Sequence, residues 1–121
     1  MEEVIAGRFG MRISAAQFSL STDSMALADF ARPKKGARVC DLGCGCGALG
    51  LLLLARDDSL FLTGVEIQPE ASLLAAQNAL DNGLSQMTVL NRDLREYRDF
   101  LPANGFDAVL SNPPYYPVSS G

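Results

Sequence analysis

The chain has 121 residues, of which 48% are hydrophobic, and a formal net charge of −4. This length allows one compact domain rather than two, and this composition excludes a disordered chain. The acidic balance is unfavourable for a nucleic-acid-binding surface, which requires clustered lysine and arginine side chains. One basic cluster, interpreted as a solvated loop before a strand, consists of Arg32, Lys34, Lys35 and Arg38.

The three cysteines, Cys40, Cys44 and Cys46, fall in a predicted strand and a tight loop, too close together for a disulfide framework. Without histidine they also make a poor zinc set, so we expect no metal and partly buried thiols in a reducing compartment. The acidic N-terminus lacks a signal-peptide pattern, and the longest apolar run, residues 48–55, is far short of a membrane span. We therefore expect a cytoplasmic protein with no membrane partner.

The part before the first predicted strand is expected to hold a short hairpin or extended lead-in and one helix. The lead-in covers residues 9–20, and Asp23 can cap a helix over residues 24–31, which Pro33 closes.

Two further helices are predicted between strands. An apolar helix covers about residues 48–56, and a second has Pro69 in its first turn and ends at Asn82-Gly83. One face of the second helix is apolar and consists of Leu73, Ala76 and Leu80.

Four segments have the pattern of short buried strands. In chain order they are residues 38–42, 60–66, 87–91 and 106–111. Their alternation with helices predicts an α/β fold with a Rossmann-like, doubly wound, mostly parallel sheet. A sheet that stops after the fourth strand leaves one edge bare, so we expect it to be truncated there, with residues 1–121 forming the N-terminal part of a longer domain.

Polar residues mark the ends of all four predicted strands. They are Asp41 with the glycines that follow it, Glu66, Asp93 and Asn112. Right-handed crossovers place the carboxyl ends of parallel strands on one edge of the sheet, where ligands bind. We therefore expect these residues to converge on one crevice.

The glycine-rich loop after the first strand indicates an adenosine-containing cofactor. A Gly-x-Gly-x-x-Gly pattern starts at Gly45, with Glu66 about twenty residues further on, and this pattern alone fits NAD as well as S-adenosylmethionine. Asp41 separates the two, because a carboxylate repels the diphosphate of NAD and favours an ammonium and a sulfonium. We therefore predict S-adenosylmethionine, bound by Asp41, Gly43, Gly45 and Gly47.

The next two strand ends supply further predicted contacts to this cofactor. Glu66 would accept hydrogen bonds from the ribose hydroxyls, a role that NAD and S-adenosylmethionine share. Asp93 would accept a hydrogen bond from the adenine amine, and Ile67, directly after Glu66, is also expected to bind the cofactor.

The motif Asn112-Pro113-Pro114-Tyr115 is the most specific feature of the sequence. The prolines stiffen the turn, so the Asn112 side-chain oxygen and the Pro113 carbonyl become fixed acceptors. Two acceptors on a conjugated amine favour a pyramidal nitrogen, release its lone pair towards the methyl group and stabilise the positive charge that develops. Tyr115 can stack on a flat substrate group, worth roughly 1–3 kcal/mol for a base. We predict all four as catalytic residues for methylation of a planar amine.

The glycine loop from Asp41 to Gly47, combined with the motif at residues 112–115, resembles class I methyltransferases of the small-domain type. Gln17-Phe18 and Thr22-Asp23 resemble the bacterial tRNA(Val) adenine-N6 methyltransferase branch, and the similarity spans about residues 9–116. The resemblance implies a seven-stranded sheet, adenine N6 in tRNA as the methyl acceptor, and Gln17 and Asp23 near the methionine end of the cofactor or over the active site. Cys46 departs from the more usual Thr or Ser.

Two alternatives from the same site remain open. A protein glutamine-N5 methyltransferase of release factors uses the same Asn-Pro-Pro-Tyr chemistry and suits the acidic balance better, but that family usually carries a helical domain before the catalytic one. The chain is alternatively an inactive cofactor-binding fragment. A NAD-dependent dehydrogenase fits the sequence least well.

Overall fold

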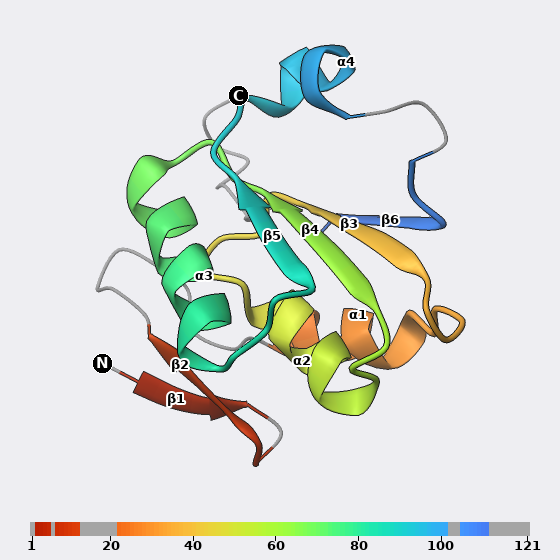
Figure 1. The fold of residues 1–121 in the computed structure, drawn as a ribbon. Helices are drawn as coiled ribbons and strands as arrows, with labels where there is room; N and C mark the ends of the chain where they lie inside the picture. Colours follow the sequence, from red (N-terminus) through yellow and green to blue (C-terminus); the bar gives the residue numbers. More distant parts are fainter. Residues whose placement is uncertain (1, 6, 13–21, 102–104, 112–121) are drawn as a thin grey trace, which may run out of the picture.

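The computed structural model describes residues 2–5, 7–12, 22–101 and 105–111. Its central sheet consists of β3 (Arg38–Leu42), β4 (Phe61–Val65), β5 (Met87–Leu90) and β6 (Ala108–Ser111). The strand order is β5-β4-β3-β6 and every neighbouring pair is parallel, as Figure 1 shows. This confirms the predicted α/β, Rossmann-like sheet, and each predicted strand is present with ends that differ by at most two residues.

The strand order creates a switch point beside β3. The chain runs outward from β3 to β4 and β5, and then crosses to the other side of β3 to form β6. Ligands of open α/β sheets bind where the strand order reverses, at the carboxyl ends of the strands. The carboxyl ends of β3 and β6 therefore frame the expected binding edge.

Helices α1 (Thr22–Phe30), α2 (Ala48–Arg56) and α3 (Pro69–Asp81) lie on one side of the sheet with an antiparallel hairpin of β1 (Glu2–Ile5) and β2 (Phe9–Arg12), as Figure 1 shows. A short 3-10 helix η1 (Leu94–Glu96) and helix α4 (Tyr97–Phe100) follow β5.

One prediction for the N-terminal part is wrong: helix α1 begins at Thr22, so Asp23 is its second residue and does not occupy the predicted cap position. The first four residues of the predicted hairpin or lead-in form β2, and its partner strand β1 lies ahead of the predicted segment. Residues 13–20 of the predicted lead-in lie outside the described residues.

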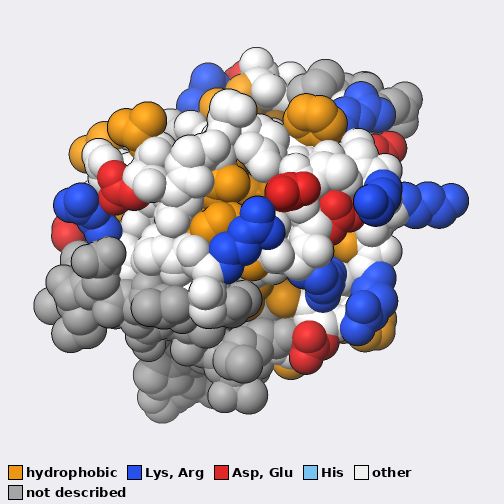
Figure 2. Space-filling view, turned by 60° about the horizontal axis from the view of Figure 1, so that its bottom comes forward, with side chains coloured by type: hydrophobic (Ala, Val, Ile, Leu, Met, Phe, Trp, Pro, Cys, Tyr) orange, Lys and Arg blue, Asp and Glu red, His pale blue; other side chains and the backbone are white. Residues whose placement is uncertain are grey.

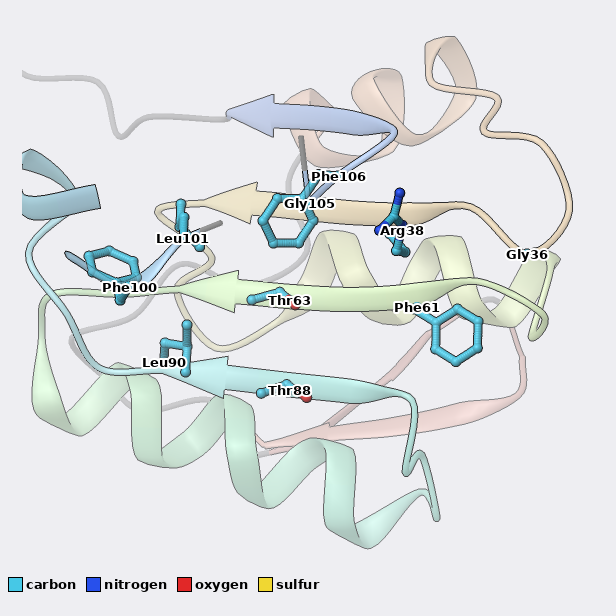
Figure 3. Close-up of a pocket in the computed structure, with 10 residues that line it drawn as sticks. All are labelled: Gly36, Arg38, Phe61, Thr63, Thr88, Leu90, Phe100, Leu101, Gly105 and Phe106. Atoms are coloured by element: carbon cyan, nitrogen blue, oxygen red, sulfur yellow. The ribbon is translucent and has the colours of Figure 1, made fainter. Parts of the chain in front are cut away.

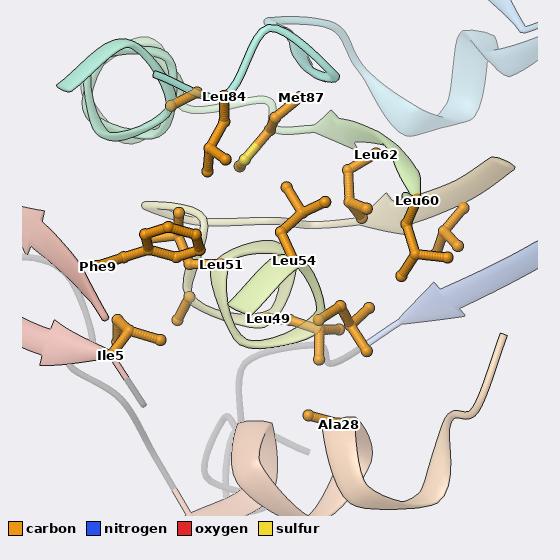
Figure 4. Close-up of a cluster of buried hydrophobic side chains, with 14 of the residues drawn as sticks. Ile5, Phe9, Ala28, Leu49, Leu51, Leu54, Leu60, Leu62, Leu84 and Met87 are labelled. Atoms are coloured by element: carbon orange, nitrogen blue, oxygen red, sulfur yellow. The ribbon is translucent and has the colours of Figure 1, made fainter. Parts of the chain in front are cut away.

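Helix α2 forms the centre of the hydrophobic core. Its leucines pack against the sheet, α1 and the hairpin, as Figure 4 shows. Leu51, Leu53 and Leu54 are fully buried. A helix that is apolar nearly all round must be surrounded by other elements, and α2 fits that rule.

The face of α3 that packs differs from the predicted one. Leu73 and Leu80 are 71% and 74% exposed. The buried face carries smaller side chains: Ala71, Ser72, Ala75, Asn78 and Ala79. Small residues let α3 approach the glycine loop and the hairpin closely, and leucines would not fit there. The structure thus corrects the apolar face predicted from Leu73, Ala76 and Leu80.

The other side of the sheet is open. Phe61, Thr63, Thr88 and Phe106 line a hollow of about 520 Å³ there, and Figure 3 shows their side chains on the sheet face turned away from α2. Of the predicted cofactor-binding residues whose side chains the structure describes, none lines this hollow. None of the described helices is long and apolar enough to cross a membrane.

Candidate functional site

The glycine loop after β3 is held by backbone hydrogen bonds. Gly43 and Cys44 both donate their N–H groups to the carbonyl of Val65, at 2.8 and 3.0 Å, and Gly47 donates to the carbonyl of Cys44 at 2.9 Å. Gly45 and Gly47 have φ values of 56° and 97°, in the left-handed region that favours glycine. The loop therefore folds over the end of β4 before α2 begins.

A second glycine, which the sequence analysis did not single out, lets this loop approach the sheet. A Cβ atom added to Gly64 in β4 would lie 2.8 Å from Cys44 Sγ and 3.0 Å from Cys44 Cβ. The signal available in the sequence was a glycine inside a buried strand, which often marks the close approach of another backbone segment.

Asp41 is a buried carboxyl group close to the start of this loop. The residue is only 3% exposed, and none of the backbone groups and side chains that the structure describes is hydrogen-bonded to its carboxyl group. Burial and, secondly, the negative charge of Glu66 raise the pKa of Asp41 to about 7. A buried carboxyl group that has no partner among the described groups is costly, so this position favours a ligand that brings a positive charge or hydrogen-bond donors.

Glu66, the predicted ribose-binding residue, holds the glycine loop. Its Oε1 accepts the N–H of Gly45 at 2.8 Å, and its Oε2 accepts the N–H of Gln68 at 3.0 Å. The carboxylate has further lone pairs for hydroxyl donors. The loop contact is a second role that sequence reasoning missed, because Gly45 and Glu66 lie 21 positions apart.

Asn91 is another residue that the sequence analysis missed at this edge. Its Nδ2 donates to the carbonyls of Glu66 and Ile67 at 2.9 and 3.0 Å, which fixes the backbone after β4. The Ile67 side chain is 55% exposed and is thus available to an apolar ligand surface.

Asp93 has a local partner in the structure. It caps η1 by accepting the Arg95 N–H at 2.9 Å, and its Oδ2 pairs with Arg95 Nη2 at 2.6 Å. These hydrogen bonds from Arg95 hold the pKa of Asp93 below its usual value. Its predicted contact with the adenine amine stays a prediction.

The predicted catalytic motif, Asn112, Pro113, Pro114 and Tyr115, lies outside the described residues, as do Gln17 and the side chain of Asp23. The strand that leads to the motif is described: Ser111, the last residue of β6, pairs with Leu42, the last residue of β3. The chain therefore enters the motif from the strand beside the glycine loop.

The electrostatics of the loop favour a cation over a diphosphate. A diphosphate site at such a loop needs unused backbone N–H groups, but those of Gly43, Cys44, Gly45 and Gly47 already donate within the protein. Glu66 adds negative charge, and so does Asp41 when its carboxyl group is ionised. The residues present thus fit the cationic ammonium and sulfonium of S-adenosylmethionine.

The model of one protein family, described as the methyltransferase small domain, matches residues 16–119. The chain belongs to this family. Membership in the methyltransferase small domain family confirms the predicted methyltransferase class and, with it, S-adenosylmethionine as the cofactor.

The curated proteins that this methyltransferase domain is similar to include two named kinds. The chain is 29% identical to the tRNA1(Val) (adenine(37)-N6)-methyltransferase of Aliivibrio salmonicida, over 90% of this chain and 46% of that protein. It is 34% identical to the protein of the same name from Pedobacter heparinus, over 80% and 41%. It is 39% identical to the release factor glutamine methyltransferase of Gloeobacter violaceus, over 74% and 30%. The chain thus spans less than half the length of these relatives.

Solved methyltransferases share the fold. TrmN from Thermus thermophilus superposes with a TM-score of 0.65 at 29% identity, over 75% of this chain and 27% of that one. A precorrin-6y C5,15-methyltransferase from Geobacter metallireducens gives 0.71 at 14% identity, over 84% and 53%, which supports the fold alone.

Proposed function

We propose that this chain holds the cofactor site of an N-methyltransferase that uses S-adenosylmethionine to methylate adenine N6 in a tRNA. The buried Asp41 carboxyl carries the cofactor part of this proposal, because none of the described groups is hydrogen-bonded to it and the neighbouring N–H groups of Gly43, Cys44, Gly45 and Gly47 already donate within the protein. The names of the relatives from Aliivibrio and Pedobacter support the substrate part.

The residues at the carboxyl edge of the sheet bind different parts of S-adenosylmethionine. The ionised Asp41 attracts the positive charges of the methionine end, and Glu66 accepts hydrogen bonds from the ribose. S-adenosylmethionine supplies the methyl group when it is bound. The other proposed binding residues are Asp23, Gly43, Gly45, Gly47, Ile67, Asp93 and Asn112.

The motif after β6 is proposed to hold the acceptor amine. The side-chain oxygen of Asn112 and the carbonyl of Pro113 each accept a hydrogen bond from one N–H of the amine, and Pro114 keeps the turn rigid. Tyr115 stacks on the base, which must first leave its stack in the RNA. No side chain has to remove a proton before transfer, which suits a chain without histidine.

The test is transfer of a labelled methyl group to unmodified tRNA, with release factor as the competing acceptor. We expect label on an adenine of the tRNA. Asn112→Ala should reduce turnover on the order of a hundredfold and leave cofactor affinity nearly unchanged, by analogy with the loss of one transition-state hydrogen bond. Ser111→Ala, one residue earlier at an exposed strand position, is the matched control. Absence of label in tRNA would refute the substrate.

A release factor glutamine is the second candidate acceptor. The Gloeobacter relative supports it, and so does the face drawn in Figure 2, where Lys and Arg side chains of the described residues are interspersed with Asp and Glu. Label on a glutamine of the release factor would make that glutamine, and not a tRNA adenine, the preferred acceptor. Cofactor binding without transfer to either acceptor would identify the chain as a binding fragment.

We also propose a cytoplasmic location. Cys40, Cys44 and Cys46 are buried and form no disulfide, although Cys44 and Cys46 are only two positions apart. Free thiols are typical of reducing compartments.

A further inference from the structure

Two asparagines bind the free edge of the hairpin: Asn78 in the last turn of α3 and Asn82, the C-cap residue of that helix. Asn82 accepts the Gly10 N–H at 3.1 Å and donates to the Gly10 carbonyl at 2.8 Å. Asn78 accepts the Arg12 N–H at 2.6 Å and donates to the Arg12 carbonyl at 3.1 Å. Each side-chain amide thus pairs with β2 as a neighbouring strand would, and together they cover an edge that β1 leaves open.

The two asparagines differ in their third hydrogen bond. Asn82 donates it to the carbonyl of Asn78, within α3 itself, at 2.7 Å. Asn78 donates it to the carbonyl of Cys46 in the glycine loop at 2.8 Å. Asn78 is also completely buried, so water cannot replace it.

The Cys46 carbonyl belongs to a peptide unit that is held at both ends. Its carbonyl accepts from Asn78, and its N–H, on Gly47, donates to the Cys44 carbonyl at 2.9 Å. Gly47 has a left-handed φ of 97°. Glycine adopts positive and negative φ values about equally readily, so this residue does not by itself fix the backbone conformation. The bond from Asn78 therefore helps to select the orientation of this peptide and, with it, the path of the loop from Gly45 to α2.

We infer that Asn78 is a positioning residue for the cofactor: it sets the glycine loop by tying the Cys46 carbonyl to α3 and β2. The inference rests on the proposed function of this loop as the S-adenosylmethionine site. Asn78 itself touches the loop backbone and acts through it.

The experiment compares Asn78→Ala with Asn82→Ala in the 121-residue chain. Both variants lose two hydrogen bonds to β2, but only Asn78→Ala loses the bond to the loop. Affinity for S-adenosylmethionine and S-adenosylhomocysteine is measured by calorimetry, at temperatures where both variants are equally folded. We expect Asn78→Ala to bind about tenfold more weakly than the wild type, and Asn82→Ala to stay within about twofold.

Amide hydrogen exchange without ligand gives a second readout. Exchange at Gly47 should accelerate in Asn78→Ala and not in Asn82→Ala, whereas exchange at Gly10 should accelerate in Asn82→Ala. If Asn78→Ala does not fold, the pair Asn78→Ser and Asn82→Ser gives the same comparison.

Each outcome separates the two proposals. Equal affinities and equal Gly47 exchange in the two variants overturn the role of Asn78 and leave the proposed function intact. A wild-type chain that binds neither compound overturns the proposed function, and the role of Asn78 in cofactor binding falls with it.

Discussion

Asp41 is a buried carboxyl group whose raised pKa makes the stability of the chain depend on pH. It lies in the interior of β3, where the residue is 3% exposed, and it faces the charge of Glu66. Its pKa of about 7, against an ordinary 3.8, means that the folded chain binds this proton more tightly than the unfolded chain. Stability linked to this group is therefore full below about pH 4 and is lost as the pH rises through about 7.

Asp41→Asn removes this pH dependence, because the amide does not ionise. Without cofactor, we expect the variant to exceed the wild type in unfolding free energy by on the order of a few kcal/mol at pH 8, with almost no difference near pH 4. Urea unfolding of both chains across this range measures the effect. A difference that does not grow with pH would show that another group titrates. At pH 8 the same variant should bind S-adenosylmethionine more weakly.

At the scale of elements, the glycine loop lies directly on β4. Gly64 and Cys44 meet there, and the Cys44 thiol is buried with a pKa raised above its usual range, chiefly by burial. Burial and a raised pKa make this thiol a packing group rather than a nucleophile.

We expect Gly64→Ala to destabilise the chain by about 1–3 kcal/mol, because its Cβ would overlap Cys44. Cys44→Ala removes the sulfur but keeps the Cβ, so the double variant should recover part of the loss. Unfolding in urea checks both, and Thr63→Ala on the opposite face of β4 is the control. Additive effects of the two substitutions would contradict the contact.

Arg56 joins α1 to α2 at their C-terminal ends. Its Nη1 donates to the Ala28 carbonyl at 2.6 Å, and its Nη2 to the Ala31 carbonyl at 2.5 Å. The planar guanidinium reaches both carbonyls, which the end of an α-helix leaves without partners.

Arg56→Lys keeps the charge but cannot span the two carbonyls in this way. We expect a loss of about 1–2 kcal/mol in unfolding free energy, measured by urea denaturation. Arg32→Lys, an exposed position beside the same helix end, should change stability little. Equal effects of the two substitutions would rule out the forked contact.

At the scale of the whole molecule, the sheet has one covered and one open face. Parallel sheets are normally buried on both faces, yet Phe61 and Val109 are 55% and 57% exposed. The expected truncation after the fourth strand stays a prediction.

Basic residues lie at both ends of the parallel strands, but only the carboxyl end is the proposed binding edge. Lys34 and Lys35 precede β3 and lie at its amino end, whereas Arg92 follows β5 at the carboxyl edge. If RNA approaches the carboxyl edge, Arg92→Glu should raise the KM for tRNA, because a phosphate contact is lost. The double change Lys34→Glu and Lys35→Glu should leave that KM nearly unchanged. Methyl-transfer kinetics at fixed salt measure both KM values. A raised KM in the double lysine variant with an unchanged KM in Arg92→Glu would indicate that RNA binds at the amino end of the strands instead.

The sequence by itself determined the order and type of most elements and the position of the glycine loop. Strand β3 and helix α2 have the predicted bounds, and α3 begins at Pro69 as expected. These features depend on neighbouring residues: the hydrophobic period, a proline in the first turn, glycines where φ is positive. The proposal that Asp41 binds a cation also came from its place next to the loop.

Only the tertiary structure decided which surfaces of these elements meet. The buried face of α3, the contact of Glu66 with Gly45, the overlap at Gly64 and the reach of Asn78 all join residues far apart in the chain. Local sequence patterns carry no information on contacts between residues far apart in the chain. The small side chains on the buried face of α3 also form no hydrophobic pattern that would mark that face. The raised pKa of Asp41 has the same origin, because burial and the charge of Glu66 exist only once the strands have paired.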